Sequence, residues 1–453
     1  MKKPSNPATI RDLTRGLIGR QLLEFALPLF LGSLIQLLYN AVDLMFVGQI
    51  LGKEASAAVG ASGLIVTCIL GLFAGLGVGV GVVAARAVGQ GAYQELDRIV
   101  HSAAGLSVLL AAVFTAFGLA LSPLFLTWMH TPADIMESAV TYIRLYLLSL
   151  TAIVSYNIGS GILRALGNSK TPMLYQLAGG LVNVLGNTLF IYALDWGVRG
   201  AALSTVCSQG LAAVLTVRRL GRAADGCQLS LRRIRLERGI CKQFLAVGVP
   251  AAVQSVVITF SNILVQTCIN DLGVVSMAAF TAYFKVENFI YLPIVAIGQA
   301  VSTFTSQNAG ALQPERIKTG ARTAVAMGLA VTVCTVGVTL LFSQTAFSLF
   351  ANEREVILLG SQIARITFPF YVLYVFLEIF ASVIRGAGKA LPVMGIIVTN
   401  MCMVRTCILR IMVLLYPNVQ GVAAVYPLTW ACTVLCLALY YKNGRWLPGN
   451  PEE

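Results

Sequence analysis

Twelve long apolar segments run through this chain, and they constrain its fold more than any other feature. About 20 helical residues, at about 1.5 Å each, cross the hydrocarbon core of a bilayer. None of the segments alternates with a period of two residues, so we predict membrane-spanning helices rather than a barrel. The predicted spans are 22–47, 56–85, 100–126, 137–163, 172–195, 198–219, 243–270, 277–306, 320–345, 356–382, 392–415 and 421–442.

Composition supports the same class. The chain is 57% hydrophobic and only 11% charged, whereas a soluble domain carries about a quarter charged residues. We therefore predict an all-α polytopic membrane protein. The net charge of +13 does not point to nucleic acid, because the basic residues cluster in short gaps between apolar segments. The positive-inside rule then places both termini in the cytoplasm, and the gap 218–242 is the richest in arginine.

The two halves of the chain repeat each other. RALGNSKTPM at 164–173 is matched 221 residues later by RGAGKALPVM at 385–394, and VRGAA at 198–202 by VQGVA at the same offset. Such a repeat indicates internal duplication, and six spans per half give both halves one orientation, related by an axis along the membrane normal. The predicted parts are a tail (1–21), a six-helix bundle (22–219), a basic linker (220–242), a second six-helix bundle (243–442) and a tail (443–453).

A polar stripe lies in the first span. Gln36, Asn40 and Asp43 are spaced so that a helix places them on one face. A carboxylate at membrane depth is costly and is seldom kept without a polar partner or a wet cavity. The stripe is therefore the first candidate site. The alternative is that Asp43, near the end of the span, reaches interfacial water.

Other polar residues at membrane depth are candidates for the same cluster. Asn183 and Asn187 in the fifth span are one helical turn apart. The fourth span carries Tyr142 and Asn157, and the sixth carries Ser204 and Thr205. The alternative is that these side chains only hold helices together, at about 0.6 kcal/mol each.

The C-terminal half also holds charges inside its spans. Lys285 and Glu287 lie in the eighth span, Glu378 in the tenth, and Arg405 in the eleventh. Buried charges of this kind either pair across helices or line a wet cavity. A structural Glu378–Arg405 ion pair and a role in binding substrate both remain open.

Several kinds of chemistry are not indicated. Most of the ten cysteines lie inside apolar segments, and the two histidines are far apart, so neither a disulfide framework nor a metal site is expected. GLGVGVG at 75–81 and GAGKA at 386–390 lack the context and spacing of nucleotide-binding loops. No catalytic set of Ser, His and Asp is evident. We predict no enzymatic activity and no cofactor.

The motif LYNAVDLMFVGQILGKEASAAVG, the RALGNSKTP loop and the duplication resemble the MATE (multidrug and toxic compound extrusion) family, in particular its DinF-like bacterial branch. The resemblance covers nearly the whole chain. It implies an inner-membrane antiporter that expels amphipathic, often cationic compounds in exchange for H⁺ or Na⁺. It also implies an ion-coupling site at Asp43, Asn183 and Thr205, with Asn157 matching by position. Asn187 stands where this branch carries a second acid, so Asp43 would couple alone in this half.

From both arguments we expect a monomeric antiporter that works by rocker-switch alternating access. Asp43 would take up a proton or bind Na⁺, and its neutralisation would let the first helix repack. The residues expected to contact substrate are Gln36, Tyr39, Asn40, Tyr142, Lys285, Glu287, Glu378 and Arg405. The first alternative is a flippase for a lipid or lipid-linked saccharide, which the cationic residues of the second half keep open. A second is a non-transporting membrane scaffold.

Overall fold

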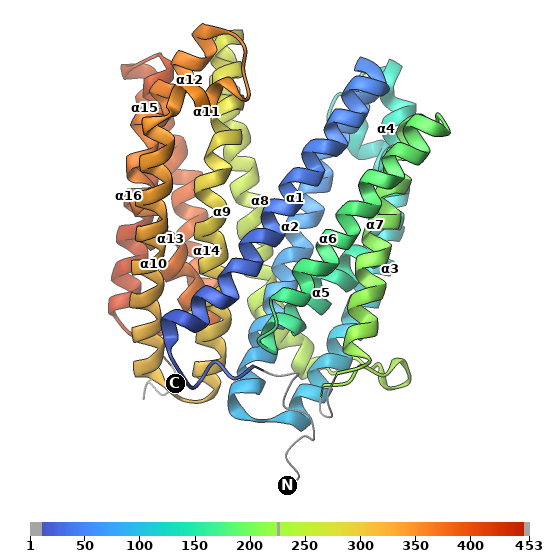
Figure 1. The fold of residues 1–453 in the computed structure, drawn as a ribbon, viewed down its shortest axis with the longest axis vertical. Coiled ribbons are helices and arrows are strands. Elements are labelled where there is room, and N and C mark those ends of the chain that lie inside the picture. The colour runs from blue at the N-terminus through green and yellow to red at the C-terminus, as the bar shows by residue number, and fades with distance from the viewer. Residues whose placement is uncertain (1–10, 224–226, 448–453) are drawn as a thin grey trace. The chain divides into compact units, whose positions relative to one another are not determined.

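The chain folds into long helices. The computed structural model describes residues 11–223 and 227–447, and within these ranges it contains helices and loops but no strand. Eleven helices are long and apolar enough to cross a membrane, and one bent helix pair makes twelve if it counts as one span. The predicted all-α membrane fold is confirmed (Figure 1).

All twelve predicted spans have helical counterparts. The helices of the first half are α1 (Ile18–Ile50), α2 (Gly52–Gln90), α3 (Tyr93–Trp128), α4 (Ala133–Leu148), α5 (Leu150–Ala165), α6 (Lys170–Asn187), η2 (Thr188–Ala193) and α7 (Gly197–Leu220). After the short η3 (Leu231–Arg233), those of the second half are α8 (Arg238–Asp271), α9 (Val274–Gly310), α10 (Pro314–Leu341), α11 (Ser343–Ser348), α12 (Arg354–Thr367), η4 (Phe368–Phe370), α13 (Tyr371–Gly386), α14 (Ala390–Val398), η5 (Thr399–Val404), α15 (Arg405–Leu415) and α16 (Val419–Lys442).

Four spans are locally irregular. The fourth bends by 44° between α4 and α5, and the tenth passes through the 3₁₀ turn η4, which contains Pro369. The fifth and eleventh spans each contain a π-helical segment, η2 and η5. Proline removes a helix hydrogen bond, and π segments are rare and often mark functional sites. The two π segments lie in spans that correspond in the duplicated halves.

Two compact units divide the chain. Unit 1 comprises Met1–Asp12 and Leu31–Ala252, and unit 2 comprises Leu13–Phe30 and Val253–Glu453. Helices α1 and α8 therefore begin in one unit and end in the other, and in each the change follows two residues after a proline, Pro28 or Pro250. The predicted bundles, 22–219 and 243–442, assign each of these helices whole to one half. The functional division into bundles remains a proposal.

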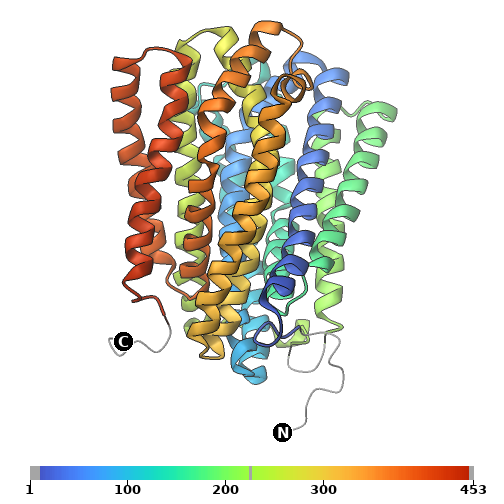
Figure 2. The same cartoon turned by 60° about the vertical axis from the view of Figure 1, so that its left-hand side comes forward.

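Within each unit the long helices pack side by side. In unit 1, α5 lies against α2 and α7, and α6 lies against α7. In unit 2, α9 lies against α10 and α13, and α13 lies against α16 (Figure 2). The core of unit 2 is built from large buried side chains, including Tyr283, Phe368, Tyr371 and Trp430.

The glycine run of α2 is a packing surface. A side chain at Gly77 would place its Cβ 2.8 Å from the carbonyl oxygen of Asn157 in α5. A side chain at Gly75 would meet the backbone of Ala252 in α8. Glycine is required at these positions because the neighbouring backbones approach too closely for any Cβ. The sequence 75–81 therefore serves helix packing, in agreement with the prediction that it is no nucleotide loop.

The segments that precede α1 and α8 are both tied down by specific contacts. Buried Leu13 donates its backbone N–H to Gln307 Oε1 at 2.8 Å, within unit 2. In unit 1, the backbone N–H of Ser230 in the linker donates to Nε2 of the buried His101 at 3.1 Å. Arg98 of α3 donates from Nε to Glu237 Oε2 at 2.9 Å. The basic linker is thus docked on α3.

Candidate ion-coupling and substrate sites

Asp43 lies in the part of α1 that belongs to unit 1. Its side chain is half-buried, whereas Asn40, one turn earlier, and Gln36, two turns earlier, are exposed. The predicted stripe therefore exists as a helical face, and Asp43 is the member that turns toward the protein interior. The alternative that Asp43 serves only interfacial water is disfavoured, because its oxygen has a protein partner.

That partner comes from α6. Asn187 Nδ2 donates to Asp43 Oδ1 at 2.7 Å and also lies 3.4 Å from Asn183 Oδ1. Both asparagines are buried, and Asn187 Oδ1 has no hydrogen-bond partner. The close packing of α6 on α7 places them there: a Cβ on Gly186 would lie 2.9 Å from Ser204 Oγ. The three predicted residues therefore form one connected network.

A second contact joins α1 to α6. Gln176 Nε2 donates to the Tyr39 hydroxyl at 3.2 Å, and Tyr39 packs over Gly180, where an added Cβ would lie 3.2 Å from its ring. Sequence reasoning missed Gln176. Its spacing from Gly180, Asn183 and Asn187 follows one helical face, so this signal was present. Buried Tyr142, on α4, is close enough to interact electrostatically with Asp43.

Two predicted members of the coupling site do not join this network. Thr205 Oγ1 donates to the carbonyl of Ala201 at 3.3 Å, one turn earlier on α7. Asn157 Nδ2 donates to the carbonyl of Ile153 at 2.9 Å on α5. Both side chains donate to a backbone carbonyl of their own helix, as short polar side chains in helices commonly do. Their part in ion binding remains a prediction.

Unit 2 holds a second carboxylate network. Glu287 Oε1 of α9 accepts hydrogen bonds from the hydroxyl of Tyr371 on α13 and, at 3.4 Å, from that of Tyr283. Both tyrosines are fully buried. Glu378 Oε1 accepts from Ser382 Oγ at 3.0 Å. Its oxygen also lies against Gly298, where an added Cβ would come within 2.7 Å.

The predicted cationic residues separate into two environments. Lys285 is exposed, with its ammonium 5.8 Å from the centre of the Phe350 ring. Arg405 is buried, and its hydrogen-bond partners are neutral. Across the described ranges no ion pair within 4 Å joins Arg405 to an acid. The alternative of a structural Glu378–Arg405 pair is therefore wrong.

Metal and thiol chemistry find little support. In residues 11–223 and 227–447 no three His, Cys, Asp or Glu side chains are grouped closely enough to hold a metal ion. All ten cysteines are free. A Na⁺ site at Asp43 remains a prediction. Asp43 Oδ1 accepts from Asn187 Nδ2, and Asn187 Oδ1 has no hydrogen-bond partner.

Comparison with known proteins gives a consistent result. The family model MatE matches residues 28–189 and again 250–410, which agrees with the predicted duplication. The probable multidrug resistance protein YpnP of Bacillus subtilis is 26% identical over 96% of this chain and 97% of its own length. A protein named FAD transporter, from Shewanella oneidensis, is 25% identical over 75% of this chain and 76% of its own length.

Solved structures show the same fold. A structure described as an outward-facing conformation of a multidrug resistance MATE family transporter of the MOP superfamily superposes with a TM-score of 0.89, at 23% identity and 98% coverage of both chains. The family whose model matches this chain consists of transporters, so the prediction that the chain is not an enzyme is confirmed. Because the family model matches well over half of its length, the chain belongs to the MATE family of multi-pass membrane transporters.

Proposed function

We propose that the protein is an antiporter that exports amphipathic, cationic compounds in exchange for H⁺ or Na⁺. The observation that carries the proposal is the network of Asp43, Asn187 and Asn183. It sets a carboxylate in a membrane-spanning helix against amide groups alone. Amides satisfy its hydrogen bonds but cannot neutralise its charge, so a bound proton or Na⁺ has a large effect on the stability of this arrangement.

The network also offers a way to respond to the ion. With Asp43 ionised, Asn187 donates to it and its own Oδ1 is left without a partner. A proton on Asp43 gives that amide oxygen a hydrogen-bond donor. A bound Na⁺ ion gives it a cation to coordinate. Either ion therefore changes how α1 is held on α6. We propose that this change is the coupling step and that a rocker-switch motion follows.

Substrate recognition is proposed for residues near these networks. Tyr39 and Tyr142, together with the exposed Gln36 and Asn40, offer aromatic and polar contacts in unit 1. In unit 2, Glu287 and Glu378 offer carboxylates to cations. The relatives named for multidrug resistance support drug-like substrates, and the relative named FAD transporter shows that the family also includes a different solute. The alternative of a lipid flippase is tested by the same vesicles.

The test is gradient-driven efflux of a fluorescent lipophilic cation in proteoliposomes. Wild type is compared with Asp43→Asn and with Asp134→Asn, which changes an exposed aspartate at the start of α4. A pH gradient is imposed first, then a sodium gradient. We expect wild type and Asp134→Asn to respond to one gradient, and Asp43→Asn to respond to neither. Wild-type efflux by Asp43→Asn would refute the proposal, and transport of a labelled lipid instead of the cation would favour the flippase.

Membrane orientation is proposed from charge alone. The basic residues of the linker and of the loops 164–170 and 385–389 are expected to face the cytoplasm, with both termini. The cell membrane is then crossed twelve times. Protease protection of a C-terminal tag in right-side-out and inverted vesicles tests this placement: the tag should be cleaved only in inverted vesicles.

A further inference from the structure

Arg405 is the most unusual side chain in unit 2. It begins α15, directly after the π-helical segment η5, and only 4% of it is exposed. A guanidinium is permanently charged, and burying it without a counter-ion is costly. No carboxylate in the described residues lies within 4 Å of it. The structure thus retains a buried positive charge without a direct ion pair.

One edge of this guanidinium is well bound. Nη1 donates to Asn262 Oδ1 at 3.0 Å and to Ser261 Oγ at 3.3 Å, both on α8. These neutral acceptors fix the orientation of the planar group. The guanidinium carbon also lies 5.2 Å from the centre of the Tyr426 ring of α16. Arg405 is therefore in contact with α8 on one side and α16 on another.

The other edge is nearly free. Nη2 has only the thioether sulfur of Met401, at 3.0 Å, and Nε has no partner. Nε and Nη2 form the edge that binds carboxylate and phosphate through two parallel hydrogen bonds. A thioether is a weak acceptor on a flexible side chain, so an anionic oxygen can displace it at low cost. The Tyr426 hydroxyl is a second buried group without a partner nearby.

The nearest acid does not satisfy Arg405. Glu287 is close enough to interact with Arg405 electrostatically. However, its Oε1 atom accepts hydrogen bonds from Tyr371 and Tyr283 and none from Arg405. When Glu287 is neutralised by a proton or by a cation, the charge of Arg405 is left uncompensated. An anionic group would then be favoured at the free edge.

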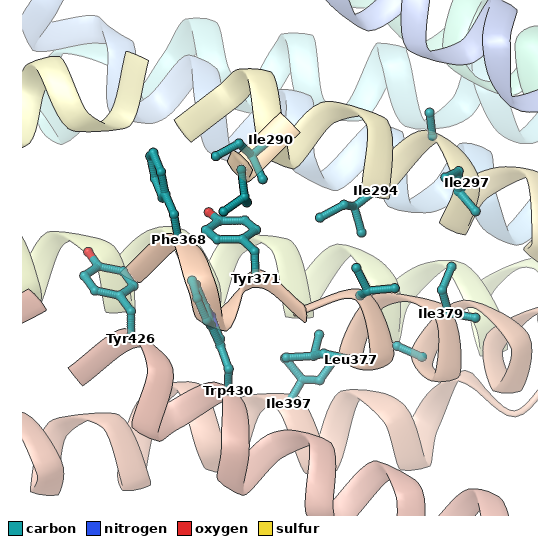
Figure 3. Packing of buried hydrophobic residues seen from close by; sticks show 14 of the residues in the cluster. Ile290, Ile294, Ile297, Phe368, Tyr371, Leu377, Ile379, Ile397, Tyr426 and Trp430 are labelled. Carbon is teal, nitrogen blue, oxygen red and sulfur yellow. The ribbon is translucent and has the colours of Figure 1, made fainter. Parts of the chain in front are cut away.

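The Tyr426 ring beside Arg405 belongs to a cluster of aromatic side chains. Tyr371 and Tyr426 both pack on Trp430, with ring centres 4.8 and 6.1 Å apart, and Phe368 packs on Tyr371 at 6.0 Å (Figure 3). Aromatic walls beside a charged anchor suit a flat apolar group that carries one anionic substituent. A free inorganic anion would need none of these walls.

We propose that the Nε–Nη2 edge of Arg405 binds the carboxylate or phosphate group of aromatic, amphipathic substrates, so that the transported compounds include zwitterions. This inference rests on the proposed function and names a substrate class for it. Met401 is the side chain that the anionic group displaces, and Ser261 and Asn262 keep the guanidinium oriented.

Rhodamine 110 and rhodamine 123 make a matched test. They share one xanthene ring system, and rhodamine 123 is the methyl ester of the rhodamine 110 carboxyl group. Binding of each dye to the purified protein is measured by fluorescence anisotropy for wild type, Arg405→Gln, Arg405→Lys and Arg410→Gln. Arg410 is an exposed arginine on the same helix, so its variant controls for a general loss of positive charge.

We expect Arg405→Gln to weaken the binding of rhodamine 110 by about tenfold more than the binding of rhodamine 123. Arg405→Lys should lose less rhodamine 110 affinity than Arg405→Gln, because lysine keeps the positive charge but cannot form two parallel hydrogen bonds. Arg410→Gln should leave the ratio of the two affinities unchanged. Equal weakening of both dyes by Arg405→Gln, with an unchanged thermal unfolding temperature, would overturn the inference.

A second experiment with chloride tests whether the site binds a small inorganic anion instead of a substrate. Chloride replaces gluconate at constant ionic strength while thermal unfolding is followed. If chloride stabilises wild type but not Arg405→Gln, and the two dyes are not distinguished, the occupant is an inorganic anion and the inference is wrong. Gradient-driven efflux of rhodamine 123 by wild type tests the proposed function independently. An unchanged ratio of the two dye affinities would therefore refute the role of Arg405 without refuting antiport.

Discussion

Asp43 in unit 1 and Glu287 in unit 2 are both membrane-embedded carboxylates, yet their surroundings differ. Asp43 is bound by the amide of Asn187, on a helix face whose neighbours Gln36 and Asn40 are exposed. Glu287 is bound by two tyrosine hydroxyls inside a packed aromatic core. An open polar face can exchange an ion with water, whereas a closed aromatic cage holds its acid in one position. From this difference we propose that the acid in unit 1 exchanges the coupling ion, whereas the acid in unit 2 stays fixed in position.

The largest effect is expected at Asn187. Asn187→Leu keeps the size of the side chain but leaves Asp43 Oδ1 without its donor. Hydrogen bonds to charged groups contribute about 1.5–3 kcal/mol, so coupled efflux should fall by at least about tenfold. Asn183→Leu should cost less, because the interaction of Asn183 with Asp43 is weaker than that of Asn187. Efflux assays in proteoliposomes that find Asn187→Leu equal to wild type would remove the special role of the unit 1 network.

Tyr371→Phe tests the cage in unit 2. It removes one donor to Glu287 and leaves the ring in place, so unfolding should become easier by about 1–3 kcal/mol. Tyr283→Phe should cost less, since its contact is 3.4 Å long. Thermal unfolding in detergent measures both. If Tyr371→Phe left stability unchanged but abolished efflux, Glu287 would be a working acid and the contrast between the units would disappear.

Glycines at close side-chain contacts in the two units give a smaller effect. Gly298→Ala sets a Cβ 2.7 Å from Glu378 Oε1, and Gly180→Ala sets one 3.2 Å from the Tyr39 ring. Each should destabilise the protein by about 1 kcal/mol, with more strain at Gly298. Gly337→Ala in α10 is the control, because nothing lies within 4 Å of its Cβ, and it should be neutral or stabilising. Identical unfolding temperatures for all three variants would contradict the packing described for these sites.

The smallest effect is expected at the linker. The Arg98 guanidinium lowers the pKa of Glu237 below its ordinary value of 4.5. A lowered pKa in the folded state means that the ion pair stabilises docking above about pH 4.5 and that this contribution is lost as the pH falls further. Glu237→Gln should speed amide exchange in residues 227–237 slightly at neutral pH, with little further change in acid. An unchanged exchange rate at pH 7 would show that the Arg98–Glu237 ion pair does not help to hold the linker.

Much of this structure is predictable from sequence because the bilayer imposes a length and a polarity on every span. The twelve spans follow from apolar length alone, and the pairing of Asp43 with Asn183 and Asn187 follows from helical spacing together with the cost of a buried acid. The family resemblance supplied Asp43 and Asn183, with Asn187 as a departure from its pattern, and the family is confirmed. The DinF-like branch remains a prediction.

Other features depend on which helices become neighbours, and periodicity does not carry that information. Glu287 was a candidate, but its tyrosine partner Tyr371 lies 84 residues away on α13. For Arg405, an ion pair with Glu378 and a role in binding substrate were both left open, and in the structure it contacts Ser261 and Asn262 of α8. The exchange of helix ends between the units also has no sequence signal beyond Pro28 and Pro250, since a continuous helix can pack against different neighbours along its length.

The most direct measurement of the contrast between the two acids is ion release when substrate binds. Purified protein in weakly buffered solution is mixed with a saturating lipophilic cation, and released H⁺ or Na⁺ is counted for wild type, Asp43→Asn and Glu287→Gln. We expect release by wild type and by Glu287→Gln, and none by Asp43→Asn. Release that persists in Asp43→Asn but is lost in Glu287→Gln would place coupling in unit 2 and refute the role proposed for Asp43.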